Sequence, residues 1–157
     1  MVKLVNNMNE FIETQKVKQA WVIVLMVTVT IFAAINYVQM PASFASVSPL
    51  VVTFLADLIL IALRLNTKIN KEGVYFQLFP FQFKGRLITW SEVASIEVRK
   101  YSPIKEYGGW GYRYGFKNGK AYNVSGNMGL QLVLKNGDRI LIGTQKPEEL
   151  ETYLKNN

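Results

Sequence analysis

The feature that constrains this chain most is a long stretch with almost no charge. Between Lys18 and Arg64 the only charged residue is Asp57. A globular protein intersperses charges to keep its surface wet, so a stretch of this length matches lipid better than water. It contains two apolar runs, residues 20–38 and 48–65. We therefore predict two transmembrane helices that form a hairpin over residues 20–65.

The first run is rich in β-branched residues, which in water would favour a strand. In lipid a lone segment can satisfy its backbone hydrogen bonds only as a helix. Trp21 stands at the start of this run, where an indole suits headgroup depth. Pro49 is expected in the first turn of the second helix, where its missing N–H is tolerated. A cleavable signal peptide is the alternative for the first run, but a second apolar run follows at once.

Residues 1–19 are predicted to be a polar lead at the membrane interface, either a short helix or an extended segment. The flanks of the hairpin are basic, with Lys16, Lys18, Arg64, Lys68 and Lys71, and the connection between the helices has no charge. Positive flanks face the cytoplasm. We therefore expect a bacterial cytoplasmic (inner) membrane protein with both termini in the cytoplasm.

From residue 66 to 157 the pattern changes to period two, with turn signals at strand spacing, which predicts an antiparallel sheet or barrel. Strands are expected at residues 67–70, 74–79 and 86–89, with a helical turn at 91–94 and a fourth strand through Ile96 and Val98. Residues 102–115 are rich in glycine and aromatics and are interpreted as a loop that bends into a strand.

The second half of this region carries the clearest turn signals. Asn-Gly pairs at Asn118 and Asn136 each predict a type I′ hairpin turn. A terminal helix is expected to open at Pro147, with Glu148 and Glu149 in its first turn. About seven strands followed by one helix is the order of a pleckstrin-homology-like domain.

Several blocks of sequence resemble an uncharacterised family of small bacterial and archaeal membrane proteins with a pleckstrin-homology-like cytoplasmic domain. They are RKYSPIKEYGGWGYR, KAYNVSGNMGLQLVLKNGDRILIGTQKPEEL, FIETQKVKQAW and TKINKEGVYFQLFPF. The resemblance implies an α+β membrane protein in which a transmembrane hairpin is followed by an antiparallel β-barrel or sandwich with a C-terminal helix. It implies interaction and not chemistry, and it carries over no catalytic or binding residue.

The composition makes an enzyme a poor interpretation. Cysteine and histidine are absent, which removes disulfides, thiol nucleophiles and the common ligands of transition metals. No two carboxylates have a spacing that suggests acid–base chemistry. The glycines of GGWG and SGNMG precede strands and not a helix, so a phosphate loop is disfavoured. We expect no catalytic residue, no cofactor and no metal.

The whole net charge of +7 lies after residue 63, where 15 Lys and Arg face 8 acidic residues. Within this part, aromatic and basic residues gather in one segment, with Tyr107, Trp110, Tyr112, Arg113, Lys117 and Lys120. Such a mixture suits an anionic lipid headgroup or a peptide, whereas a nucleic acid is not expected. The alternatives are that the aromatics pack the sheet and that the charge serves solubility.

Asp57 lies near the middle of the second predicted span, where a carboxylate needs a partner. In a hairpin its depth matches Thr28, Thr30 or Asn36 of the first span. Hydrogen bonding between helices is one interpretation, and an ion path through an oligomer is the other.

Together these patterns predict a membrane-anchored, non-enzymatic interaction or scaffold module. Its expected partners are the lipid bilayer, a protein partner or further copies of this chain, and anionic lipid. The alternative function is a small oligomeric channel or transporter subunit centred on Asp57.

Overall fold

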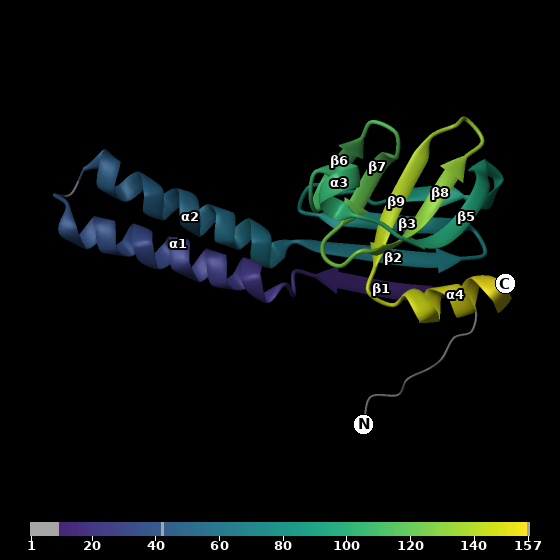
Figure 1. The fold of residues 1–157 in the computed structure, drawn as a ribbon, viewed down its shortest axis with the longest axis horizontal. Coiled ribbons are helices and arrows are strands. Elements are labelled where there is room, and N and C mark those ends of the chain that lie inside the picture. The colour runs from purple at the N-terminus through teal and green to yellow at the C-terminus, as the bar shows by residue number, and fades with distance from the viewer. Residues whose placement is uncertain (1–9, 42, 157) are drawn as a thin grey trace, which may run out of the picture. The chain divides into compact units, whose positions relative to one another are not determined.

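The computed structural model describes residues 10–41 and 43–156, which form two compact units (Figure 1). The helical unit comprises Lys16–Leu63, and the β domain comprises residues 10–15 and 64–156. The β domain is therefore built from two separate stretches of chain, and the helical unit lies between them in the sequence.

Two helices make up the helical unit, α1 (Ala20–Gln39) and α2 (Phe44–Ala62). α2 begins earlier than the sequence predicts because Ser43 and Ser46 form a capping box at its first turn. Pro49 consequently lies inside α2, so the prediction that it occupies the first turn is wrong. α2 also ends before the predicted span does, because the chain enters a strand at Arg64.

Apolar side chains cover the outside of both helices. Phe32, Val38 and Ile61 are 68%, 82% and 73% exposed, and Ala33 and Ser46 are the only buried residues within the described parts of α1 and α2. Both helices are long and apolar enough to cross a membrane. A core helix of a soluble protein would bury this surface, so the exposure fits the two predicted spans.

Four strands form the first sheet in the order β1-β2-β3-β4. They are β1 (Phe11–Lys16), β2 (Arg64–Asn70), β3 (Gly73–Phe79) and β4 (Arg86–Thr89). β2 and β3 are antiparallel, with Arg64 opposite Phe79, and β4 starts where Arg86 lies opposite Phe76. The three strands predicted in this part of the sequence therefore all occur.

The strand β1 differs from the predicted polar lead, whose residues 1–9 lie outside the described residues. It lies beside β2 and runs in the opposite direction (Figure 1). Thr14 Oγ1 donates to Asn66 Oδ1 at 3.0 Å. Two of the three inward-facing side chains are polar, Glu13 and Gln15, so the sequence lacks the apolar alternation that would reveal a strand.

The Glu13 carboxylate and the Gln15 side-chain N–H of β1 have partners at the end of β9 (Arg139–Thr144), whereas Gln15 Oε1 is buried without one among the described residues. The Glu13 carboxylate accepts hydrogen bonds from Thr144 Oγ1 and from the backbone N–H of Gln145, both at 2.7 Å. Gln15 is fully buried and donates to the carbonyl oxygen of Gly143. These bonds make β1 an integral part of the β domain.

Five strands form the second sheet in the order β5-β8-β9-β7-β6. Besides β9 they are β5 (Val93–Lys100), β6 (Gly111–Gly115), β7 (Gly119–Asn123) and β8 (Met128–Leu134). The two Asn-Gly pairs lie at the predicted turns, between β6 and β7 and between β8 and β9. β7 and β9 are parallel, a departure from the predicted antiparallel order. The described residues thus form nine strands where the sequence predicts about seven.

The two sheets pack against each other, with the rings of Phe76 and Tyr122 4.7 Å apart. A helical turn, Trp90–Glu92, precedes β5 as predicted. The helix α3 (Pro103–Tyr107) occurs in a segment interpreted as a loop. The predicted C-terminal helix is α4 (Pro147–Asn156), which buries Leu150. The fold is therefore α+β, with two apolar helices, two sheets and a C-terminal helix.

Candidate functional site

Cationic side chains from three parts of the β domain line one surface pocket of about 320 Å³, which we call the basic pocket. Its cations are Arg86, Lys117, Lys120 and Arg139, and Tyr114 and Phe116 line it as well. Phe116 is 101% exposed and Tyr114 is 67% exposed. The pocket therefore combines positive charge with accessible aromatic rings, a combination that suits an anionic group.

The fold brings these residues together from separate strands. Lys117 lies in the β6–β7 turn, Lys120 lies in β7, and the parallel pairing of β7 with β9 puts Lys120 opposite Ile140, next to Arg139. Gly119 has a φ of 73°, and a Cβ on it would lie 2.1 Å from the carbonyl oxygen of Arg139. Only glycine permits this close approach, which holds the turn against β9.

The positive charge of the basic pocket is largely uncompensated. None of its four cations forms an ion pair with a carboxylate of the residues that the structure describes. Asp138 also lines the pocket, and its carboxylate accepts a hydrogen bond from Asn136 Nδ2. Arg139 donates to the carbonyl oxygen of Lys117 at 3.4 Å. Four cations and one acid thus leave a net positive potential available to a ligand.

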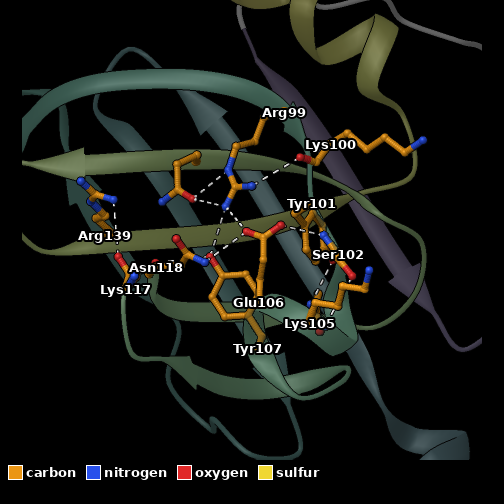
Figure 2. A network of polar contacts seen from close by, with 12 residues as sticks. Arg99, Lys100, Tyr101, Ser102, Lys105, Glu106, Tyr107, Lys117, Asn118 and Arg139 are labelled. Atoms are coloured by element: carbon orange, nitrogen blue, oxygen red, sulfur yellow. Dashed lines mark hydrogen bonds and ion pairs between the residues drawn. The ribbon is translucent and has the colours of Figure 1, made fainter.

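A polar network next to the pocket fixes the β6–β7 turn, as Figure 2 shows. Its centre is the carboxylate of Glu106 in α3, which accepts from Arg99 at 2.8 Å, from the backbone N–H of Ser102 at 2.7 Å and from Asn118 Nδ2 at 3.2 Å. The Tyr107 hydroxyl donates to the carbonyl oxygen of Asn118. The network thereby joins β5, α3 and the turn that carries Lys117.

The network also sets the charge state of Glu106. Partial burial disfavours the charged carboxylate, but the hydrogen bonds from Arg99 and the Ser102 backbone outweigh it and hold the pKa of Glu106 below its ordinary value. Burial raises the pKa of Tyr101 to about 12, and its hydroxyl accepts a hydrogen bond from Asn123. At neutral pH the network therefore consists of an ion pair surrounded by neutral hydroxyl and amide groups.

The structure separates the six residues predicted as a contact site. Tyr107 is buried at 4% exposure against Tyr101, and Tyr112 is half exposed with its ring 5.0 Å from that of Tyr122. Arg113 donates to the carbonyl oxygen of Trp110. Lys117 and Lys120 are the two members that line the basic pocket.

The prediction missed Arg86 and Arg139, which complete the set of cations in the pocket. Both lie at the start of a strand, in β4 and β9, far from residue 117 in the sequence. No spacing in the sequence links them to the β6–β7 turn, because the pairing of β7 with β9 brings Arg139 there and Arg86 comes from β4 of the other sheet.

In the helical unit, the structure selects one partner for Asp57. Thr30 Oγ1 donates to Asp57 Oδ2 at 2.8 Å. Thr28 and Asn36 instead donate to carbonyl oxygens of their own helix, those of Val24 and Phe32. Asp57 and Thr30 line a groove of about 580 Å³ whose other lining residues are mainly apolar.

No group of three or more Asp or Glu side chains within residues 10–41 and 43–156 could hold a metal ion. Comparison with models of known protein families gives no match, and comparison with curated proteins gives no significant match.

Proposed function

We propose that this chain is a membrane-anchored, non-enzymatic binding module. Its two apolar helices span the bacterial cytoplasmic membrane and hold a pleckstrin-homology-like domain at the cytoplasmic face. The basic pocket of that domain binds the phosphate group of an anionic lipid. The convergence of Arg86, Lys117, Lys120 and Arg139 without a carboxylate partner among the described residues is the observation that carries this proposal.

Two further observations support it. Two packed sheets with a C-terminal helix are the main parts of a pleckstrin-homology-like domain, although β1 and the parallel β7–β9 pair are additions to the predicted order. The inner leaflet of a bacterial membrane is rich in anionic lipid, and each Lys or Arg near such a surface contributes about 1 kcal/mol of attraction. A cationic pocket on a domain tethered there meets its ligand at high local concentration.

The test compares two double variants that remove the same charge. Lys117→Gln with Lys120→Gln changes the pocket, whereas Lys105→Gln with Lys135→Gln removes two exposed lysines outside it. The full chain in neutral detergent is titrated with phosphatidylglycerol and with phosphatidylcholine, and native mass spectrometry counts the bound lipid. We expect about tenfold weaker binding of phosphatidylglycerol by the pocket variant and little change in the control variant.

Each result has a distinct meaning. An equal loss of phosphatidylglycerol binding in both variants would indicate diffuse electrostatic attraction and would show that the pocket is not a specific binding site. Unchanged phosphatidylglycerol binding in both variants would remove lipid as the ligand and would leave an acidic segment of a protein partner.

The alternative function, an oligomeric channel or transporter subunit, depends on Asp57. The hydrogen bond from Thr30 gives Asp57 a partner inside the hairpin, which supports a packing role over an ion path. We therefore place the function in the β domain.

A further inference from the structure

We propose that the loop between β3 and β4, residues 80–85, inserts its phenylalanine side chains into the surface of the bilayer that α1 and α2 span. We call this segment the aromatic loop. The inference rests on the proposed membrane anchoring, but it concerns a surface outside the basic pocket. It gives the β domain an apolar contact with lipid in addition to the attraction of charges.

The aromatic loop exposes large apolar side chains that the β domain leaves uncovered. Phe81 is 60% exposed and Phe83 is 83% exposed. Burying a phenylalanine side chain is among the larger favourable contributions that one residue makes, and a cluster of exposed aromatics on a folded domain marks a contact surface.

Hydrogen bonds fix the loop in this exposed arrangement. Gln77 Nε2 donates to the carbonyl oxygens of Gln82 and Phe83, at 3.3 and 2.9 Å. Gln82 Oε1 accepts from the backbone N–H of Leu78 at 3.1 Å, and the Gln82 N–H donates to the Leu78 carbonyl oxygen. The ring of Phe83 meets that of Phe79 edge to face at 6.2 Å. The loop is thus ordered before it meets a ligand, which lowers the entropic cost of binding.

The position of the loop in the first sheet identifies lipid as the occupant. Phe79, the last residue of β3, lies opposite Arg64, the first residue of β2. Arg64 follows the last residue of α2, Ala62, by two positions, so the chain allows at most roughly 7 Å between them. The headgroup layer on each side of a bilayer is about 5–8 Å thick. A span that ends at Ala62 therefore puts Arg64, and with it Phe79 and the loop, at headgroup depth.

The charges near the loop fit the same occupant. The Arg64 guanidinium lies 5.2 Å from the centre of the Phe79 ring, and Lys84 in the loop is exposed. Neither cation forms an ion pair with a carboxylate among the residues described in the structure. Phenylalanine next to Lys and Arg suits the bilayer interface. There the phenyl rings contact the upper part of the acyl chains, and the cationic side chains contact the lipid phosphates.

The absence of cysteine from the sequence allows single labelled sites. We would prepare the full chain as Phe81→Cys, Phe83→Cys and Glu72→Cys, label each with an environment-sensitive dye, and reconstitute it into phosphatidylcholine–phosphatidylglycerol vesicles. Glu72 is exposed in the β2–β3 turn, at the opposite end of β2, roughly 20 Å from Arg64 along the strand. A label at Val29→Cys, within α1, reports whether the helices are in the bilayer.

We expect dye at positions 81 and 83 to be shifted to the blue and to be quenched at least twofold more by lipids with a spin label near the headgroup than dye at position 72. Equal quenching at positions 81, 83 and 72 would overturn the proposal, as would a blue shift without lipid quenching, which would indicate a protein contact. If dye at position 29 is not quenched by lipids labelled deep in the acyl chain, the membrane anchoring itself fails. Circular dichroism of each variant confirms that the β domain remains folded.

Discussion

Glu106 is the residue on which the arrangement of the β6–β7 turn depends most. Its carboxylate accepts hydrogen bonds from Arg99, Ser102 and Asn118. Glu106→Gln retains the shape of the side chain but removes the charge, and we expect it to lower the free energy of unfolding of the β domain by roughly 1–2 kcal/mol at neutral pH. Urea unfolding of the full chain in neutral detergent, followed by tryptophan fluorescence, measures the change.

The Glu106 carboxylate should also make the stability of the β domain depend on pH. Because its folded pKa lies below the ordinary value of 4.5, its contribution to stability is complete above 4.5 and is lost as the pH falls through the folded pKa. The wild-type chain should therefore lose more stability than Glu106→Gln does as the pH falls below 4.5. Parallel pH curves for the two chains would show that the ion pair with Arg99 adds nothing to the fold.

Asp57 is the second residue whose role can be tested directly. Asp57→Asn keeps an oxygen that accepts from Thr30, so it should leave the stability of the hairpin unchanged. Asp57→Leu and Thr30→Val should each weaken it by roughly 1 kcal/mol. Thr28→Val is the matched control, because Thr28 donates to its own helix. Unfolding in mixed micelles compares the four variants.

A different result would support the alternative function. Ion or proton flux in reconstituted vesicles that is present in the wild-type chain and disappears in Asp57→Asn would contradict a packing role, because the substitution keeps the hydrogen bond and removes only the titratable group.

Residue-level interpretation of the sequence could propose partners where a side chain has a local or generic role. A carboxylate in an apolar run needs a partner wherever it lies, so the partners considered for Asp57 included Thr30. The basic pocket could not be assembled in this way, because Arg139 reaches it through the pairing of β9 with β7, and Arg86 reaches it from β4 of the other sheet. Tyr107 belongs to a run of aromatics that looks uniform in sequence, yet it is buried while Tyr114 is exposed.

At the scale of elements, β1 is the strand that the sequence does not predict. The Asn-Gly turns were predictable because glycine at a positive φ is a local requirement. β1 has no such signal, since Glu13 and Gln15 occupy its inward positions. Their partners lie more than a hundred residues away, at Gly143, Thr144 and Gln145. α3 was not predicted for a related reason, because its five residues are too few to show the periodicity of a helix.

The β domain should consequently need β1. A chain of residues 64–157 alone would lack the buried Phe11 side chain, whose ring lies 6.3 Å from that of Tyr153, and would leave Thr144 and the Gln145 N–H without the Glu13 carboxylate. We expect it to be less stable, by roughly 2–4 kcal/mol, than a chain in which residues 10–16 are joined to residue 64 by a short Gly-Ser linker. Urea unfolding of both soluble chains gives the difference. Equal stability would show that β1 is dispensable.

At the scale of the whole molecule, the order of elements restricts how the chain can cross a membrane. β1 precedes α1, β2 follows α2, and the two strands are neighbours in one sheet. If both helices span the bilayer, both ends of the hairpin must therefore emerge on the same side. A signal peptidase that cut after the first run would also remove β1, so the buried contacts of Glu13 and Gln15 argue against that alternative.

The pairing of β1 with β2 requires both ends of the helical hairpin to lie on the same side of the membrane. The basic flanks predict which side that is. Lys16, Lys18 and Arg64 border the hairpin, so we expect a reporter after residue 157 to be active in the cytoplasm and one inserted after Met40, between the helices, to be active outside. Activity of both reporters on the reversed sides would overturn the orientation and leave the hairpin intact. A result that places residues 16 and 64 on opposite sides of the membrane would be incompatible with the pairing of β1 and β2. It would contradict both the fold of the β domain and the membrane topology.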